Sequence, residues 1–226
     1  MKKVSIVIPA YNEAERIVPT LRAIRASVPC DELIVVDDGS RDHTASLAER
    51  LADQVLRHGA NRGKGAALQT GWNVSAGEIV VFLDADLAES AAEAHRLIAP
   101  VLAGECDMAI GHLPAPPRKA GLGLAKGLAC QGIRWLTGFH ALAPLSGQRA
   151  LRREVLQAVG SLDEGFGVEV GLTIDALRAG FTVKEIPVAF SHRLTGNDWH
   201  GLVHRGREFV AIGRALRKKW RGGSKA

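Results

Sequence analysis

Cysteine is scarce in this sequence, and long apolar runs are absent. The three cysteines, Cys30, Cys106 and Cys130, lie far apart and form no CxxC pair, so we expect neither a disulfide framework nor a zinc site. No stretch approaches the roughly 18 to 20 consecutive apolar residues of a membrane-spanning helix. The first apolar run reaches Pro9 too soon for a signal peptide. These absences predict a cytoplasmic protein, at most peripheral at the inner face of a membrane.

Two common nucleotide-binding loops are missing as well. No GxGxxG pattern follows the first apolar run, which argues against a dinucleotide-dependent oxidoreductase. The glycine-rich turn at 58–65 lacks the GxxxxGK spacing of a Walker A loop, and Gly65 stands where that loop has Ser or Thr. A phosphate site in this chain must therefore be built in another way.

The composition suits one domain with a C-terminal appendage. The chain has 226 residues, of which 46% are hydrophobic, so a sizeable core is available. Its formal net charge of +5 permits an anionic partner. Basic residues gather in 201–226, where an amphipathic helix is predicted. Such a helix either lies on an anionic membrane or packs on its own domain or on a twin subunit.

Three continuous apolar runs, at 4–8, 32–38 and 78–84, alternate with helical patterns. Their β-branched residues are typical of strands buried on both faces, so the first half predicts a parallel sheet built from βαβ units. A later strand at 182–190 contains Pro187 and is therefore expected at the sheet edge.

The second half is less regular. Residues 111–147 break the rhythm with Pro and Gly clusters, and the apolar residues between them predict a helix that is either a lid over the sheet or a packed connection. A further helix is predicted over about 170–179, and Gly180 is placed to end it.

Polar residues follow each of the three early strands, at the end where ligands bind in open parallel sheets. They are, in chain order, Pro9, Tyr11, Asn12 and Glu13; Asp37, Asp38, Gly39 and Ser40; and Asp84 and Asp86.

Asp84 and Asp86 would share a face of an extended segment. Two carboxylates in a site poor in water repel each other unless they share a proton or a cation. Mg²⁺ or Mn²⁺ suits such oxygen ligands and commonly completes its shell with substrate phosphates. The alternative is that Asp86 caps the next helix while Asp84 pairs with an arginine, and the spacing alone leaves both open.

Other candidates are basic or lie far along the chain. Arg62 and Lys64 open a helix whose N-terminus favours anions, which suits a phosphate, although a solvated basic turn is the alternative. Glu169 is a candidate general base, and His192 could join Asp86 on a metal ion. Taken singly, a lone Glu or His is more often structural.

A set of four segments resembles the nucleotide-sugar domain of family 2 glycosyltransferases with the GT-A fold: VSIVIPAYNEAERI, IVVDDGSRDHT, NRGKGAAL and VVFLDADLA. The resemblance implies a Rossmann-like, mostly parallel sheet flanked by helices. It divides residues 1–200 into a nucleotide-sugar-binding half, 1–111, and an acceptor half, 112–200, before the helix and tail at 201–226.

The resemblance also implies roles for single residues. The segment after the first strand and Asp38 would hold the nucleotide base and ribose, Lys64 would lie near the diphosphate, and the DxD pair would bind metal and ribose. The implied nucleotide-sugar residues are thus Pro9, Tyr11, Glu13, Asp38, Lys64, Asp84 and Asp86.

The second half is similar to more specific groups. The segment PLSGQRALRREVL resembles polyprenyl-phosphate (dolichyl-phosphate-type) sugar transferases, and GFGVEVGLTIDALRAG followed by SHR resembles glucosyl-3-phosphoglycerate synthases. The second likeness implies that Asp86 and His192 share a metal and that Glu169 lies near the acceptor or sugar. The chain departs from both groups: it has no transmembrane helices, and VEVGL lacks the Glu-Asp pair that supplies a base in many inverting members.

We therefore predict a metal-dependent glycosyltransferase that moves a sugar from a nucleotide-diphosphate donor, UDP-glucose preferred, to a phosphorylated acceptor such as a polyprenyl phosphate or a phosphoglycerate-like molecule. The predicted catalytic residues are Asp86, Glu169 and Arg149, and the predicted ligands of Mg²⁺ or Mn²⁺ are Asp84, Asp86 and His192.

Three alternatives remain at this point. A phosphatase of the haloacid dehalogenase type also places DxD after a strand, but after the first strand and followed by Thr or Val, where this chain has Leu87. A sugar nucleotidylyltransferase needs a glycine-rich loop after the first strand, where this chain has PAYNEAE. A non-catalytic nucleotide-sugar-binding protein keeps the fold without the chemistry.

Overall fold

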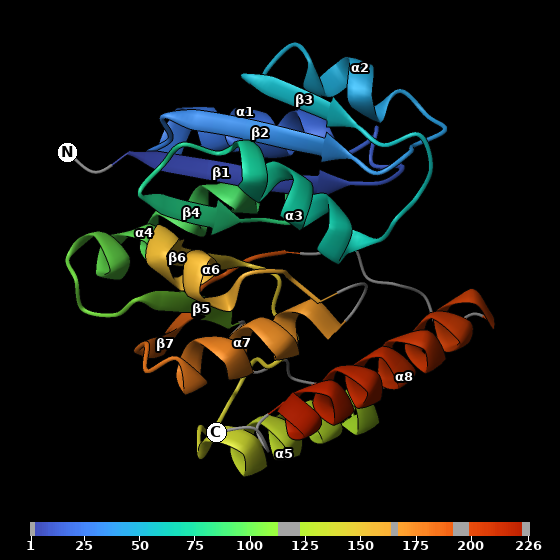
Figure 1. Ribbon diagram of the computed structural model, residues 1–226. Coiled ribbons are helices and arrows are strands. Elements are labelled where there is room, and N and C mark those ends of the chain that lie inside the picture. Colours follow the sequence, from blue (N-terminus) through green and yellow to red (C-terminus); the bar gives the residue numbers. More distant parts are fainter. Residues whose placement is uncertain (1–2, 113–122, 164–166, 192–198, 223–226) are drawn as a thin grey trace.

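A seven-stranded sheet forms the centre of the molecule, in the order β3-β2-β1-β4-β6-β5-β7 (Figure 1). The computed structural model describes residues 3–112, 123–163, 167–191 and 199–222, with backbone alone at 199–208 and 222. The strands are β1 (Val4–Ala10), β2 (Glu32–Asp37), β3 (Gln54–Arg57), β4 (Ile79–Phe82), β5 (Met108–His112), β6 (Arg149–Arg152) and β7 (Val183–Pro187). β6 runs antiparallel to β4 and β5, and the other neighbouring pairs are parallel. The predicted mostly parallel sheet is confirmed.

The sequence pattern identifies β1, β2, β4 and β7 but misplaces some of their ends. β1 continues to Ala10, because β2 still pairs with it there, whereas β4 stops at Phe82 opposite Val7. The sequence analysis expected Pro9 to follow the first strand. This expectation is wrong, because Pro9 lies inside β1. β7 pairs with β5 alone and ends at Pro187, so the predicted edge position is correct.

The strands β3, β5 and β6 carry no clear signal in the sequence. β3 has four residues at the sheet edge, and its end residues are exposed. β6 reads Arg-Ala-Leu-Arg, yet Arg149, Ala150 and Leu151 are all buried, because β4 and β5 enclose it on both sides. The burial of β6 is a property of the assembled sheet and not of its local pattern.

Helices cover both faces of the sheet. One face packs against α1 (Ile17–Ser27), α2 (Thr44–Ala48), the 3₁₀ helix η1 (Ala88–Ala94) and α4 (His95–Leu102). The other packs against α3 (Lys64–Val74), α6 (Arg153–Val159) and α7 (Val168–Arg178). The predicted helix over 170–179 is thus α7, and Gly180, at φ 85°, ends it: the Gly180 and Phe181 amides bond to the carbonyls of Leu177 and Ala176.

A further helical layer lies beyond α7. α5 (Gly123–Thr137) and α8 (Trp199–Gly222) run side by side beneath it in Figure 1. α7 serves both layers: Val168, Leu172 and Ala176 join the sheet core, whereas Val170 and Ile174 pack with α5 and α8. α5 is therefore a packed helix and α8 packs on its own domain, two of the options left open by the sequence. Within the described residues, no helix has both the length and the hydropathy needed to cross a bilayer.

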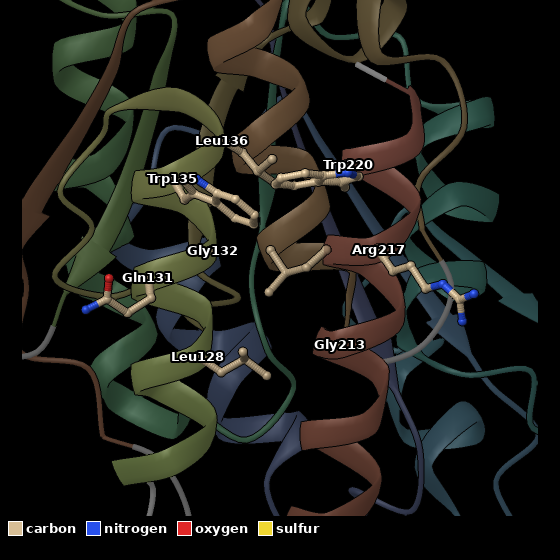
Figure 2. A pocket seen from close by; sticks show the side chains of 9 residues that line it. Leu128, Gln131, Gly132, Trp135, Leu136, Gly213, Arg217 and Trp220 are labelled. Atoms are coloured by element: carbon tan, nitrogen blue, oxygen red, sulfur yellow. The ribbon is translucent and has the colours of Figure 1, made fainter. Parts of the chain in front are cut away.

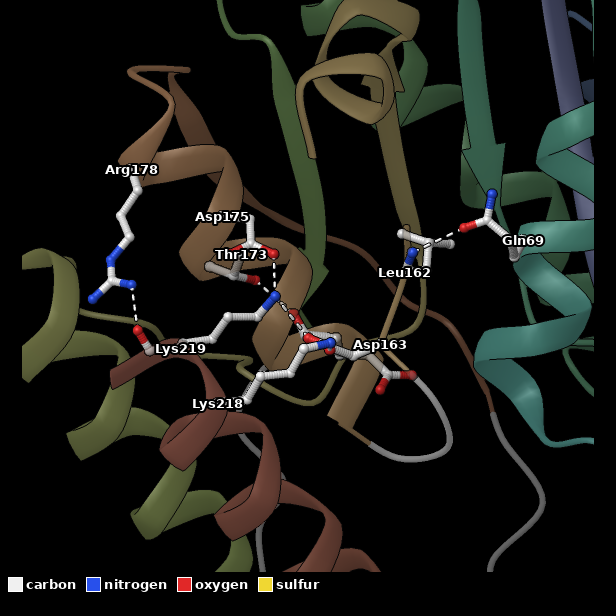
Figure 3. A network of polar contacts seen from close by, with 9 residues as sticks. Gln69, Leu162, Asp163, Thr173, Asp175, Arg178, Lys218 and Lys219 are labelled. Atoms are coloured by element: carbon white, nitrogen blue, oxygen red, sulfur yellow. Dashed lines mark hydrogen bonds and ion pairs between the residues drawn. The ribbon is translucent and has the colours of Figure 1, made fainter. Parts of the chain in front are cut away.

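Ion pairs fasten the end of α8 to α7 (Figure 3). Lys219 binds Asp175 on α7 and lies 2.8 Å from Asp163 Oδ2, while Lys218 Nζ lies 2.5 Å from Asp163 Oδ1. Arg178 donates a 2.7 Å hydrogen bond to the Lys219 carbonyl. We call Asp163, Asp175, Lys218 and Lys219 the α7–α8 clamp.

Candidate active site

Hydrogen bonds draw together the segments that follow β1, β2 and β4. Asn12, at φ 56°, donates its amide to Ser40 Oγ (2.9 Å) and accepts the Arg41 amide on Oδ1 (2.8 Å). The Arg16 guanidinium donates to the Asp86 carbonyl at 3.2 Å. The three sets of strand-end residues that the sequence analysis selected therefore lie at one edge of the sheet.

Asp38 organises the turn that leads into α3. Its side chain is buried, and Oδ1 accepts the Arg62 amide at 2.9 Å while Oδ2 accepts the Gly63 amide at 2.8 Å. His58 Nδ1 lies 2.6 Å from the same Oδ1. Gly39, at φ +77°, permits this close approach, because a Cβ there would lie 2.7 Å from the Ala60 carbonyl carbon. These contacts fix the backbone that carries Lys64.

Lys64 joins two carboxylates from distant parts of the chain. Its Nζ lies 2.6 Å from Asp84 Oδ1, just after β4, and 3.0 Å from Glu169 Oε1, in the first turn of α7. Gln148 Nε2 donates to Asp84 Oδ2 at 2.7 Å. Gly147 makes room for this group, since a Cβ there would lie 2.3 Å from Lys64 Nζ. We call Lys64, Asp84, Gln148 and Glu169 the site cluster.

The charge of Lys64 is held by its partners. Burial disfavours the ammonium, but the charges of Asp84 and Glu169 and their hydrogen bonds outweigh burial and raise the pKa of Lys64 above its ordinary value. Lys64 is also the first residue of α3, where the helix dipole disfavours a cation. A lysine fixed at a helix N-terminus by two acids is well placed to meet an anion that enters between them.

Arg149 lies behind the site cluster and not at its surface. Its side chain is 1% exposed, Nε donates to the Ser146 carbonyl at 2.9 Å, and Nη1 donates to Thr173 Oγ1 at 2.9 Å. Burial lowers the pKa of Arg149 to about 10, although Glu169 and Glu185 act in the opposite direction. The guanidinium is still charged at neutral pH, so it adds positive potential close to Glu169 from the protein interior.

The remaining predicted residues take varied positions. Tyr11 is 42% exposed, and the Glu13 amide donates to Thr44 Oγ1 at 2.8 Å. Asp86 is half-buried, and His192 lies outside the described residues. Leu83, Ala85 and Leu87 alternate with the two acids and join the core, whereas Asp84 and Asp86 are half-buried; residues 85 and 86 form a turn and not the extended segment on which the shared face was predicted.

Sequence reasoning missed Gln148, a member of the site cluster, and Gly147, which makes room for it. Gly147 and Gln148 directly precede Arg149 in the SGQRA segment, but the segment contributed only its arginine to the prediction. The available signal was the resemblance of this segment to polyprenyl-phosphate sugar transferases. Its meaning depends on β6 lying beside β4, which brings residues 147 and 148 to Asp84.

The carboxylates suit a divalent metal only if the substrate completes the coordination shell. Asp84 and Asp86 offer hard oxygen ligands of the kind that Mg²⁺ and Mn²⁺ prefer, and the Lys64 ammonium already shows that a cation fits beside Asp84. Across 3–112, 123–163, 167–191 and 199–222, however, no three His, Cys, Asp or Glu side chains form a closed metal site. The donor set fits an ion held jointly with phosphate oxygens.

Comparison with known proteins places the chain in a family. Residues 5–159 match the glycosyl transferase family 2. Polyprenol monophosphomannose synthase from Mycolicibacterium smegmatis is 34% identical over 211 residues, which cover 84% of this chain and 78% of that protein. Glycosyltransferase AglD from Haloferax volcanii is 31% identical over 96% of this chain, which spans 37% of the length of that relative.

A solved structure extends the likeness to three dimensions. Glucosyl-3-phosphoglycerate synthase from Mycobacterium tuberculosis, in complex with Mn²⁺, UDP and glucosyl-3-phosphoglycerate, superposes with a TM-score of 0.81 at 28% identity, covering 96% of this chain and 80% of that one. The same synthase has also been crystallised with Mg²⁺ and UDP. The predicted GT-A fold is confirmed, and the expected cofactor is of the type that this neighbour binds.

The family match argues against the phosphatase and the nucleotidylyltransferase as alternatives. It covers Lys64, Asp84 and Gln148 and the strands that place them, and the structural likeness covers 96% of this chain. By sequence, fold and the acids at the carboxyl edge of its sheet, the chain belongs to glycosyl transferase family 2 and is a glycosyltransferase.

Proposed function

We propose that this glycosyltransferase moves a sugar from UDP-glucose, its preferred donor, to a phosphorylated acceptor, either a polyprenyl phosphate or a phosphoglycerate-like molecule. The observation that carries the proposal is the position of Lys64 Nζ, 2.6 Å from Asp84 and 3.0 Å from Glu169. One cation joins the acid expected to meet the donor to the acid expected to meet the acceptor. Crystals of the similar synthase with UDP-glucose and phosphoglyceric acid support both substrate classes.

The residues divide the work on the donor. Tyr11, Glu13 and the segment fixed by Asp38 receive the base and ribose, and Pro9 sets the path of the chain that carries them. Lys64 turns from its carboxylates towards the diphosphate as negative charge grows on the leaving group, which is where a fixed cation lowers a barrier most.

We assign Asp84 and Asp86 as protein ligands of Mg²⁺ or Mn²⁺, with His192 as a third. When bound, the ion stabilises the departing nucleoside diphosphate as a Lewis acid. The half-buried position of both acids supports this assignment, since such carboxylates are accessible to a substrate and still shielded in part from water.

The acceptor side is governed by Glu169 and Arg149. A phosphorylated acceptor that attacks through its phosphate is already ionised at pH 7, so it needs little help from a base, whereas a hydroxyl acceptor needs one. Glu169, with 9% of its side chain exposed, is the carboxylate in place for that proton. Arg149 supplies positive potential from behind it.

The setting of the reaction is part of the same proposal. We place the enzyme in the cytoplasm as a homodimer, with peripheral contact of residues 201–226 at the inner membrane face when the acceptor is a lipid phosphate. The polyprenol-phosphate relative supports the lipid acceptor.

A thermal-shift panel tests the donor and the metal together. UDP-, GDP- and ADP-sugars are compared with Mn²⁺, Mg²⁺ or a chelator, and a ligand at 100 times its Kd stabilises the fold by about 2.7 kcal/mol. We expect UDP-glucose with metal to raise Tm most and Asp86→Ala to abolish the metal-dependent part. Glu89→Ala, an exposed acid of the same segment, is the matched control and keeps it.

The panel also has outcomes that contradict the proposal. A flat response to all donors would count against the whole assignment, and an unchanged response in Asp86→Ala would remove this residue from the metal site. Sugar transfer to each acceptor class is measured by mass spectrometry. A donor that raises Tm but is not used for transfer to either class would instead identify a non-catalytic binding protein.

A further inference from the structure

An apolar groove runs between α5 and α8, away from the site cluster. It encloses about 510 Å³ and is lined mainly by Leu128, Trp135, Leu136, Leu216 and Trp220 (Figure 2). The two helices run in the same direction, because Gly132 meets Leu216 and the next turn brings Trp135 to Trp220, with ring centroids 3.9 Å apart.

Each helix carries an apolar stripe, part of which lines this groove. Leu124, Leu128 and Trp135 follow a helical spacing along α5, and Phe209, Leu216 and Trp220 do so along α8. Trp135 is 70% exposed and Trp220 is 47% exposed, although both are large and apolar. Gly213 leaves space in the groove wall, since a Cβ there would meet nothing within 4 Å.

The surroundings of the groove are strongly basic. In the sequences of α5 and α8 there are nine Lys and Arg residues against one acid, Glu208. Lys126, Arg134, Arg214, Arg217 and Arg221 are exposed in the structure. The clamp residue Lys219 is buried beneath, so it fixes α8 in place and takes no part in the outer surface.

Charge decides between two possible occupants of this groove. A second copy of the chain, related by a two-fold axis, would bring the same basic flanks face to face and repel. An anionic lipid surface is complementary to the flanks and provides hydrocarbon for the stripes, and tryptophan prefers the boundary between headgroups and acyl chains.

We propose that the α5–α8 face docks on an anionic lipid surface, with hydrocarbon entering the groove between the two helices. This goes beyond peripheral contact by a C-terminal helix, because α5 supplies about half of the groove lining and the α7–α8 clamp fixes α8 in place. Docking does not depend on the proposed donor or acceptor, so it can be tested without either.

Vesicle sedimentation of the full chain tests the proposal. We expect binding to phosphatidylcholine vesicles that contain phosphatidylglycerol, weak binding to pure phosphatidylcholine, and loss of binding at high salt. Trp135→Ala with Trp220→Ala should lower the partition coefficient by about tenfold or more. Leu142→Ala removes an exposed apolar side chain outside the groove and is the matched control, with unchanged binding expected.

A second pair of variants tests the proposal without removing large apolar side chains, whose loss could impair folding. Arg214→Gln and Arg217→Gln change exposed charges alone, and each should weaken binding about fivefold at low salt, from about 1 kcal/mol per charge near the surface. Equal binding to neutral and anionic vesicles, or full binding by the tryptophan variant, would overturn the proposal. So would a dimer in lipid-free light scattering that dissociates on the same tryptophan substitutions, since the groove would then belong to a second copy.

Discussion

Two lysines of this enzyme are held in the same way, and they differ in what surrounds them. Lys64 lies between Asp84 and Glu169 in the site cluster, and Lys219 lies between Asp163 and Asp175 in the α7–α8 clamp. Both clusters use an acid of α7, and both rely on a glycine for space. A Cβ on Gly147 would lie 2.3 Å from Lys64 Nζ, and one on Gly171 would lie 2.1 Å from Asp163 Oδ2.

The two lysines differ in their position relative to the helix dipole. Lys64 begins α3, where a cation is disfavoured, whereas Lys219 lies in the last turn of α8, where a cation is favoured. The Lys64 ammonium is also the more accessible, at 24% against 11% exposure of the side chain. Lys64 is disfavoured by its helix dipole and partly exposed, which suits the binding of an anion. Lys219 is favoured by its helix dipole and more deeply buried, which suits a role in stability.

Lys64→Met should break this comparison on the functional side. Without the cation, the diphosphate loses a preorganised partner, and we expect kcat to fall by about 100- to 1000-fold, as for loss of one transition-state donor. The change in Tm should be smaller than for Lys219→Met. Steady-state transfer assays and thermal unfolding, run on both variants, measure the two effects; a full-activity Lys64→Met enzyme would end its assignment to the donor site.

Lys219→Met should break it on the structural side. Two acids, one of them buried, lose their shared cation, and we expect the free energy of unfolding to fall by about 3 kcal/mol with kcat nearly unchanged. Lys218→Met is the matched control, because that side chain is 65% exposed and Lys219 still neutralises Asp163, so we expect a loss of under about 1 kcal/mol. Urea unfolding of both variants decides, and equal losses would show that the buried pair has no special weight.

Gly147→Ala should sharpen the role of space in the site cluster. The new methyl group would displace the end of Lys64 and press on Asp84, and a misplacement of this kind lowers kcat by about 10- to 100-fold. Stability should change little, because a flexible side chain can move aside. Gly180→Ala offers a contrast, since its φ of 85° makes the strain local and remote from the site. An active Gly147→Ala enzyme would mean that Lys64 need not hold its observed position.

The stabilisation by the clamp should depend on pH and be lost in acid. Burial raises the pKa of Asp163, but Lys218 and Lys219 outweigh it and hold that pKa below its ordinary value. The stabilisation is therefore complete above the unfolded pKa of about 3.9 and is lost as pH falls through the lower, folded value. Unfolding of Asp163→Asn between pH 2 and 6 should show a flatter dependence, and parallel curves for both proteins would contradict this account.

Prediction from sequence succeeded where a local pattern carries the answer. The apolar runs of β1, β2 and β4 and the acids that follow them can be predicted, because a run of buried β-branched residues and the carboxylates directly after it are neighbours in the sequence. β6 could not be predicted, since it has only four residues and both of its end residues are arginines. Gln148 and Gly147 were missed for the same reason: their place beside Asp84 depends on β6 pairing with β4. The division into 1–111 and 112–200 stays a prediction, although β6 and β7 join the same sheet as β1.

The sequence by itself determined a parallel α/β sheet, its acidic carboxyl edge, the glycine turn before Lys64 and the family. These features are local, because periodicity, turns and motifs depend on residues that are close together in the sequence. Only the tertiary structure decided that Lys64 meets Glu169, that Arg149 is buried behind it, and that Lys219 clamps α8 while Trp135 and Trp220 line one groove. Partners of a charge, and the open face of a helix, depend on which elements pack together, and no short stretch of sequence specifies that.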